Sequence, residues 1–216
     1  MFEDRRDAGR QLGAAVARLG LEDPLVLGIA RGGVIVAAEV ADALDAELGV
    51  AVARKLGAPM NPELGIGAVT ADGTVVLDEE VALATGASES FVRAQIERET
   101  AEARRRLEAF DGRFLRDPAG RVVVLVDDGI ATGVTARAAL RALRRAGARS
   151  VILAVPCAPP RTVDELGLEA DRVVALIIDR DFIATGQYYR DFRPVSDEDV
   201  LAALEAAATR REKISP

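Results

Sequence analysis

The stretch that decides the fold is Val122-Val123-Val124-Leu125-Val126-Asp127-Asp128-Gly129-Ile130-Ala131-Thr132-Gly133-Val134-Thr135. Its first five residues are apolar β-formers without alternation, which predicts a strand buried on both faces. Two carboxylates end this strand, and a turn rich in Gly and Thr follows. The pattern beyond the turn predicts an amphipathic helix that ends at Gly147.

A strand, a short Gly/Thr turn and a helix N-terminus together form an anion site. Unpaired backbone N–H groups and the positive end of the helix dipole both face such a turn. Asp127 and Asp128 would repel a phosphate there unless they bind another part of the ligand, such as hydroxyl groups or a metal ion. A ribose 5-phosphate satisfies both halves of the motif. The simpler interpretation is an ordinary turn with the acids as a helix cap, but a cap needs only one acid.

The run resembles the signature of the type I phosphoribosyltransferases, enzymes that use 5-phosphoribosyl 1-diphosphate (PRPP). The resemblance implies that Asp127 and Asp128 hold the ribose hydroxyls, directly or through water bound to Mg²⁺. It also implies that the 5-phosphate is wrapped by Ala131, Thr132, Gly133, Val134 and Thr135. The resemblance is specific in this run and looser over the rest of residues 25–191.

Composition limits the alternatives. The chain has 216 residues, half of them hydrophobic, which is enough for a sizeable core. We expect a single domain over 1–216, with a core at about 22–178, a flexible loop or hairpin at about 57–80, and a small C-terminal hood at about 179–216. No apolar run approaches the ~18 residues of a membrane span, and the first residues lack the shape of a signal peptide. We therefore expect a cytoplasmic protein without a membrane partner.

The rare residue types exclude several chemistries. One cysteine, Cys157, rules out an internal disulfide and a metal site built from cysteines, and the chain has no histidine for a catalytic triad or a zinc site. The net charge of −7 argues against a nucleic-acid partner.

Two further polar clusters follow predicted strands. The strand at 25–29 leads into Arg31-Gly32-Gly33, where the glycines let backbone N–H groups approach an anion closely. The strand at 50–53 leads into Arg54-Lys55, which alone could be a solvated strand end. The resemblance implies that Arg31, Gly32 and Gly33 form a pyrophosphate loop, and that Arg54 and Lys55 face the pyrophosphate as catalytic cations.

The remaining segments of the sequence predict further helices and strands of an α/β fold. A helix from Asp4 to Leu19 is interpreted as packing only, and a hairpin with an Asp72-Gly73 turn falls within the expected loop. A long helix from Ser88 to about Phe110 has a charged surface that we expect to be solvated. Two more strands and a closing helix follow, at 150–155, at 173–178 and from about 196.

Strands separated by helices predict a doubly wound open parallel sheet, in which ligands bind at the carboxyl ends of the strands. The resemblance thus implies an α/β domain of the type I phosphoribosyltransferase kind. Cations at two strand ends and acids at a third suit a phosphorylated sugar bound with Mg²⁺, which prefers oxygen ligands and often shares substrate phosphates.

The acceptor is less clear from the sequence. By resemblance to the hypoxanthine/guanine enzymes, Phe182 and Tyr188 would bind a base and Asp191 would help hold Mg²⁺. The match fails at Ala131 and Pro156, where those enzymes carry an acid and a lysine. A small aromatic C-terminal core is the plainer alternative.

The sequence thus predicts a Mg²⁺-dependent phosphoribosyltransferase that moves the 5-phosphoribosyl group of PRPP to a nitrogen acceptor, a nucleobase, and releases pyrophosphate. Members of this family are often homodimers, and the same is expected here. The alternative is a non-catalytic PRPP-binding regulatory protein. A dinucleotide-binding domain would need Gly-x-Gly-x-x-Gly, which residues 28–33 do not supply.

Overall fold

A parallel sheet forms the centre of the fold in the computed structural model, which describes residues 1–62, 64–110 and 114–214. The five strands of this sheet lie in the order β2-β1-β6-β7-β8, and every neighbouring pair is parallel. Their bounds are β1 Leu25–Ile29, β2 Glu47–Ala51, β6 Val122–Val126, β7 Ser150–Ala158 and β8 Arg172–Ile178. The predicted parallel α/β fold is confirmed. Residue 63 of the expected loop and residues 215–216 of the expected hood lie outside the described residues.

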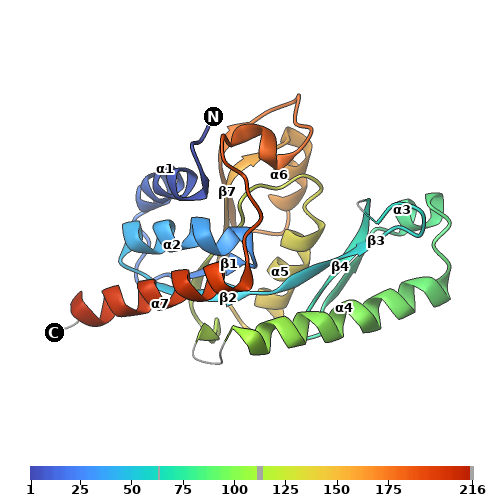
Figure 1. Cartoon of the computed structure of the whole chain (residues 1–216), viewed down its shortest axis with the longest axis horizontal. Helices are drawn as coiled ribbons and strands as arrows, with labels where there is room; N and C mark the ends of the chain where they lie inside the picture. The colour runs from blue at the N-terminus through green and yellow to red at the C-terminus, as the bar shows by residue number, and fades with distance from the viewer. Residues whose placement is uncertain (63, 111–113, 215–216) are drawn as a thin grey trace.

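Helices cover both faces of this sheet (Figure 1). Successive side chains of a strand point to opposite faces, so that Val124 packs in one cluster of buried residues and Val123 and Leu125 in another. The first cluster, called the main core below, includes residues of four helices, α1 Arg5–Ala17, α2 Gly32–Leu44, α4 Glu89–Ala109 and α7 Asp197–Ile214. The second includes residues of α5 Val134–Arg145 and α6 Pro160–Leu166. This double coverage explains why the strands read as apolar runs without alternation.

An arm extends from the central sheet (Figure 1). It contains a second, antiparallel sheet in the order β3-β4-β5. Its elements are β3 Ala53–Gly57, β4 Gly65–Thr70, β5 Val75–Leu77, α3 Glu79–Ala84 and α4 Glu89–Ala109. The predicted hairpin is confirmed: Gly73 adopts φ 85° in its turn, a conformation that favours glycine.

The prediction that Arg54 and Lys55 follow the end of a strand is wrong. The strand predicted at 50–53 is β2, which ends at Ala51 opposite Ile29, and the chain then enters the arm. Arg54 and Lys55 lie inside β3 and pair with Val69 and Ala68 of β4. The sequence could not reveal this change of sheet because β2 and β3 are separated by a single residue, Val52.

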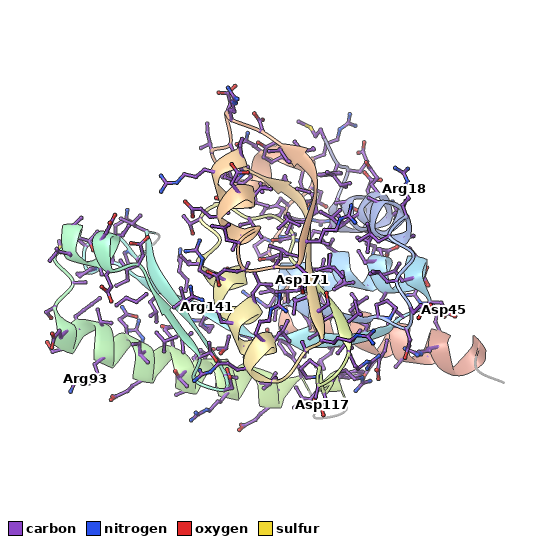
Figure 2. The ribbon with its side chains drawn as sticks, turned by 180° about the vertical axis from the view of Figure 1, so that it is seen from behind. Arg18, Asp45, Arg93, Asp117, Arg141 and Asp171 are labelled. Carbon is purple, nitrogen blue, oxygen red and sulfur yellow. The ribbon has the colours of Figure 1, made fainter. Side chains whose placement is uncertain are left out.

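The long helix α4 begins where predicted, with the Ser88 hydroxyl accepting a hydrogen bond from the backbone N–H of Phe91. Its surface is only partly solvated, contrary to the prediction. Figure 2 shows Arg93 on the outer side of the helix, whereas Glu99 is buried and forms an ion pair of 2.7 Å with Arg54. The fully buried Phe110 follows the last turn and joins the main core.

The C-terminal part differs from the expected hood. Residues 179–196 include a short 3₁₀ turn, Thr185–Tyr188, but α7 packs in the main core through Val200, Ala203 and Leu204. Ser196 and Asp199 cap α7 reciprocally, as the sequence predicted. Among the described residues, no helix combines the length and apolarity that crossing a bilayer requires.

The contact of Phe110 with the main core yields a stability prediction. Phe110→Ala should lower the free energy of unfolding by about 3–5 kcal/mol, because it leaves a cavity where α4 joins the core. Chemical denaturation measures this change. Leu83→Ala is the matched control, since Leu83 is 82% exposed and should change stability by no more than about 0.5 kcal/mol. Equal effects of the two substitutions would contradict the assigned packing.

Candidate functional site

The parallel pairing of β1 with β6 brings two strand-to-helix turns together. Gly28 lies opposite Val126 in the register, so that residues 30–33 and 127–135 both leave the sheet at its carboxyl edge. A Cβ on Gly32 would overlap the Asp128 carboxylate, and one on Gly33 would lie 2.7 Å from the carbonyl oxygen of Val126. Only glycines allow the two turns to approach this closely.

The turn before α5 has the features of an anion site. Gly133 precedes the first residue of the helix with φ 75°, and no side chain caps the helix N-terminus. Ala131 and Thr132 are exposed, while the buried Thr162 hydroxyl donates a hydrogen bond of 2.7 Å to the carbonyl oxygen of Ala131. The N-terminal amide groups of α5 are therefore held in place and open to an anion.

The acidic pair lies beside this turn. The backbone N–H of Asp128 donates to the carboxylate of Asp127 at 2.9 Å. Burial, followed by the charge of Asp128, raises the pKa of Asp127 well above its usual range. Burial and the same two carboxylates raise the pKa of the Cys157 thiol to about 12, which disfavours the reactive thiolate form.

Sequence reasoning missed one residue of the site, Arg5. Its Nε donates to the Asp128 carboxylate at 2.8 Å, and its side chain is 11% exposed. The first helix had been interpreted as packing only, and no local motif marks Arg5, because its partner lies 123 positions away in the sequence. Only the fold brings the two residues together.

The cations predicted for pyrophosphate lie in different surroundings. Arg31 belongs to the turn before α2 and lies 4.0 Å from Asp197. Arg54 is held by Glu99 in the arm. A Cβ on Gly65 would meet both the Lys55 side chain at 3.2 Å and Val134 at 3.3 Å, which places the stem of Lys55 near the N-terminus of α5.

The aromatic residues near the C-terminus form a cluster beside the acids. The Tyr188 hydroxyl donates to Asp179 at 2.9 Å, and the Tyr188 ring lies 5.3 Å from that of the partly exposed Phe182. The Tyr189 hydroxyl donates to the backbone oxygen of Asp128 at 2.5 Å. Tyr188 and Tyr189 are both buried. The small aromatic core that the sequence allowed is therefore present, with Phe182 at its exposed margin.

Asp191 lies on the same segment. Its carboxylate is bound by Arg193 at 2.6 Å, and this hydrogen bond lowers the pKa of Asp191. A cavity of about 460 Å³ adjoins Asp191, Arg193 and Arg5. Within the described ranges, no three Asp, Glu or Cys side chains converge as a metal-binding group.

At the carboxyl edge of this α/β domain an uncapped helix N-terminus, an acidic pair and a facing Gly-Gly turn lie together. This arrangement is typical of a class of protein, the α/β domains that bind phosphorylated ligands at the ends of parallel strands. The sequence agrees with this class: residues 7–192 match the family model described as phosphoribosyl transferase domain. The chain belongs to this family.

Two kinds of relative support the assignment. Proteins from two strains of Mycobacterium tuberculosis, both named "Putative phosphoribosyl transferase", are 46% identical over 208 residues, which cover 96% of this chain. The aligned region covers 47% of those relatives, so the chain spans about half their length. The crystal structure of TT1426 from Thermus thermophilus is 47% identical, with a TM-score of 0.79 over 94% of this chain and 97% of that one.

The two tyrosines of the chain provide a test of the site. Burial and the hydrogen bond to Asp179 raise the pKa of Tyr188 to about 12, and burial and the charge of Asp128 raise the pKa of Tyr189 further. The two neutral phenols contribute to the free energy of unfolding. This contribution should be fully present below pH ~10, the pKa of tyrosine in the unfolded chain, and should be lost as the pH rises through the pKa values of the folded protein.

Absorbance at the tyrosinate band should therefore stay low in the native protein at pH 10 and appear at that pH only in denaturant. Tyr188→Phe serves as the control that leaves Tyr189 alone. A native titration with a midpoint near pH 10 would show that the two hydroxyls do not have the contacts described.

Proposed function

We propose that this domain is a Mg²⁺-dependent phosphoribosyltransferase that binds PRPP, transfers its 5-phosphoribosyl group to a nitrogen acceptor and releases pyrophosphate. The observation that supports this most strongly is the uncapped N-terminus of α5 directly beside Asp127 and Asp128. One part offers amide groups to a phosphate, and the other offers carboxylates to hydroxyls. Few ligands other than a sugar phosphate match both at this spacing.

The two ends of PRPP would then bind to the two turns. The 5-phosphate would accept hydrogen bonds from the backbone and hydroxyl groups of residues 131–135. The pyrophosphate would lie at the turn of Arg31, Gly32 and Gly33, which packs directly against the acidic pair. Asp127 and Asp128, which begin the second turn and lie against Gly32 and Gly33 of the first, would accept hydrogen bonds from the ribose hydroxyls.

In the reaction, the C1–O bond to pyrophosphate breaks with its electron pair leaving on the pyrophosphate oxygen. The acceptor nitrogen forms the new bond to C1 and loses its proton to solvent. The sugar develops positive charge as the leaving group departs. The protein contributes by positioning both reactants and by neutralising the departing charge. Arg31 is one such cation, and Arg54 or Lys55 would serve the same purpose from the arm.

The residues present fit Mg²⁺ through the chemistry of their donors. Asp127 and Asp128 provide oxygen ligands at the carboxyl edge, and Mg²⁺ usually completes its coordination with water and substrate phosphates. The absence of a group of three ligand side chains among the described residues is consistent with that mode. When bound, Mg²⁺ would neutralise the charge of the diphosphate. That Asp191 helps to hold Mg²⁺ stays a prediction, since its carboxylate forms an ion pair with Arg193.

A nucleobase is the acceptor that we propose, and Phe182 is the residue most suited to stack on it. Phe182 is partly exposed at the edge of the aromatic cluster, whereas Tyr188 is buried and its hydroxyl binds Asp179. Tyr188 would therefore act by supporting Phe182. A homodimer is proposed by analogy with the family only.

A non-catalytic PRPP-binding role is the second candidate. It is favoured by the ion pairs of Arg54 with Glu99 and of Asp128 with Arg5, since both groups are already neutralised within the chain. The two candidates differ in a single observable, the release of pyrophosphate.

The deciding experiment is calorimetric titration of PRPP with and without Mg²⁺, followed by a pyrophosphate-release assay against a panel of purine and pyrimidine bases. The transferase predicts binding that depends on Mg²⁺ and release with one base. Binding without release for every base would favour the regulatory role. No binding of PRPP would exclude both.

The acidic pair gives a sharper test. Asp127→Asn with Asp128→Asn should abolish turnover, because amides carry no charge and bind hydroxyls and Mg²⁺ weakly. Circular dichroism should show the fold retained. The exposed Asp164 supplies the matched control, and Asp164→Asn should leave turnover unchanged. Full activity in the double variant would remove the pair from the mechanism.

A further inference from the structure

Arg5 contacts three separate parts of the site. Its Nε donates to Asp128, one terminal nitrogen donates to the backbone oxygen of Arg193 at 2.9 Å, and its guanidinium carbon lies 3.9 Å above the Phe192 ring. A Cβ on Gly32 would come within 2.9 Å of Arg5 Nε, so Arg5 also lies against the turn before α2. A surface arginine that formed an incidental ion pair would not have all four neighbours.

The chain around Arg5 is also fixed in place. The N–H of Phe2 donates to the oxygen of Tyr188, the N–H of Arg190 donates back to the oxygen of Phe2, and the N–H of Asp191 donates to the oxygen of Glu3. Residues 2–5 and 188–193 thus form one unit above the acidic pair. The ring of Tyr189 packs in it against Phe2 at 5.4 Å and Phe192 at 4.9 Å.

The charge of Arg5 matters because Asp128 is 16% exposed and directly follows Asp127. Arg5 is the cation that forms an ion pair with Asp128, and the Cys157 thiol and the Tyr189 hydroxyl also lie close to the acidic pair. Removing the charge of Arg5 would take this counter-ion from Asp128 beside a second largely buried carboxyl, which is unfavourable. A lysine would keep the charge, but it lacks the planar guanidinium group. It could not stack on the Phe192 ring while donating hydrogen bonds to both Asp128 and the backbone oxygen of Arg193.

We propose that Arg5 is a positioning residue for PRPP, which orients the Asp128 carboxylate toward the ribose and links it to the unit formed by residues 2–5 and 188–193. This inference rests on the proposed function, since Asp128 is assigned there to the ribose hydroxyls. The unit formed by residues 2–5 and 188–193 would then affect the affinity for PRPP, although both segments lie far in sequence from residues 122–135. The opposite possibility is that Arg5 competes with the ribose for Asp128.

Calorimetric titration of PRPP with Mg²⁺ into the full chain separates these possibilities. Arg5→Gln should weaken PRPP binding by about tenfold or more, because a hydrogen bond between two charged groups is lost. Arg5→Lys should weaken it less. The matched control is Arg18→Gln, because Arg18 lies exposed at the other end of the same helix, as Figure 2 shows, and it should bind PRPP as the parent chain does.

A double-mutant cycle tests the link to the C-terminal segment. Phe192→Leu removes the aromatic ring that Arg5 stacks on. The factor by which this substitution weakens PRPP binding should be about threefold or more smaller in the Arg5→Lys variant than in the parent chain. Thermal unfolding of each variant controls for loss of fold. A residue that only stabilises the structure would shift unfolding without changing the dissociation constant of PRPP.

The outcomes distinguish this inference from the function on which it rests. If the parent chain does not bind PRPP, the proposed function fails. If the parent binds and folded Arg5→Gln binds equally well, Arg5 has no positioning role. Tighter binding by Arg5→Gln would show that Arg5 competes with the ribose and would likewise overturn the inference.

Discussion

The parallel pairing of β1 with β6 is the constraint on which the site depends. Each strand ends in a turn that leads into a helix, and the pairing places both turns at the same edge of the sheet. The turns can be neighbours only because Gly32 and Gly33 present no Cβ to Asp128 and Val126. A sheet order that separated these strands would keep both motifs in the sequence and lose the arrangement that lets them bind one ligand.

The sequence predicted this part of the structure well because its signals are local. A buried parallel strand, an uncapped helix start and a Gly-Gly turn each depend on a few consecutive residues, and the rule for ligand sites in open parallel sheets supplies the rest. The acidic pair and the residues 131–135 therefore lie where predicted, and the family match confirms the class. Their individual roles remain predictions.

The failures have a common physical cause, which is dependence on distant partners. Arg54 was expected at a strand end but lies inside β3, because one residue separates two strands of different sheets. Glu99 was expected in solvent but is buried against Arg54, a partner that no helical periodicity could reveal. Arg5 follows an ordinary helix cap, and its importance depends on residues 128 and 193. Charged residues with tertiary partners look like surface residues in a sequence.

The contact between residues 2–5 and 188–193 has a consequence for the order in which the protein folds. Arg5 and Arg193 are 188 positions apart, whereas β8, the last strand of the central sheet, ends at Ile178. The central sheet does not include either of these two segments, so it can form before residues 2–5 and 188–193 meet. Contacts of such long sequence separation form late and slowly. We therefore expect the acidic pair to gain its contact with Arg5 and the 188–193 segment after the central sheet has formed.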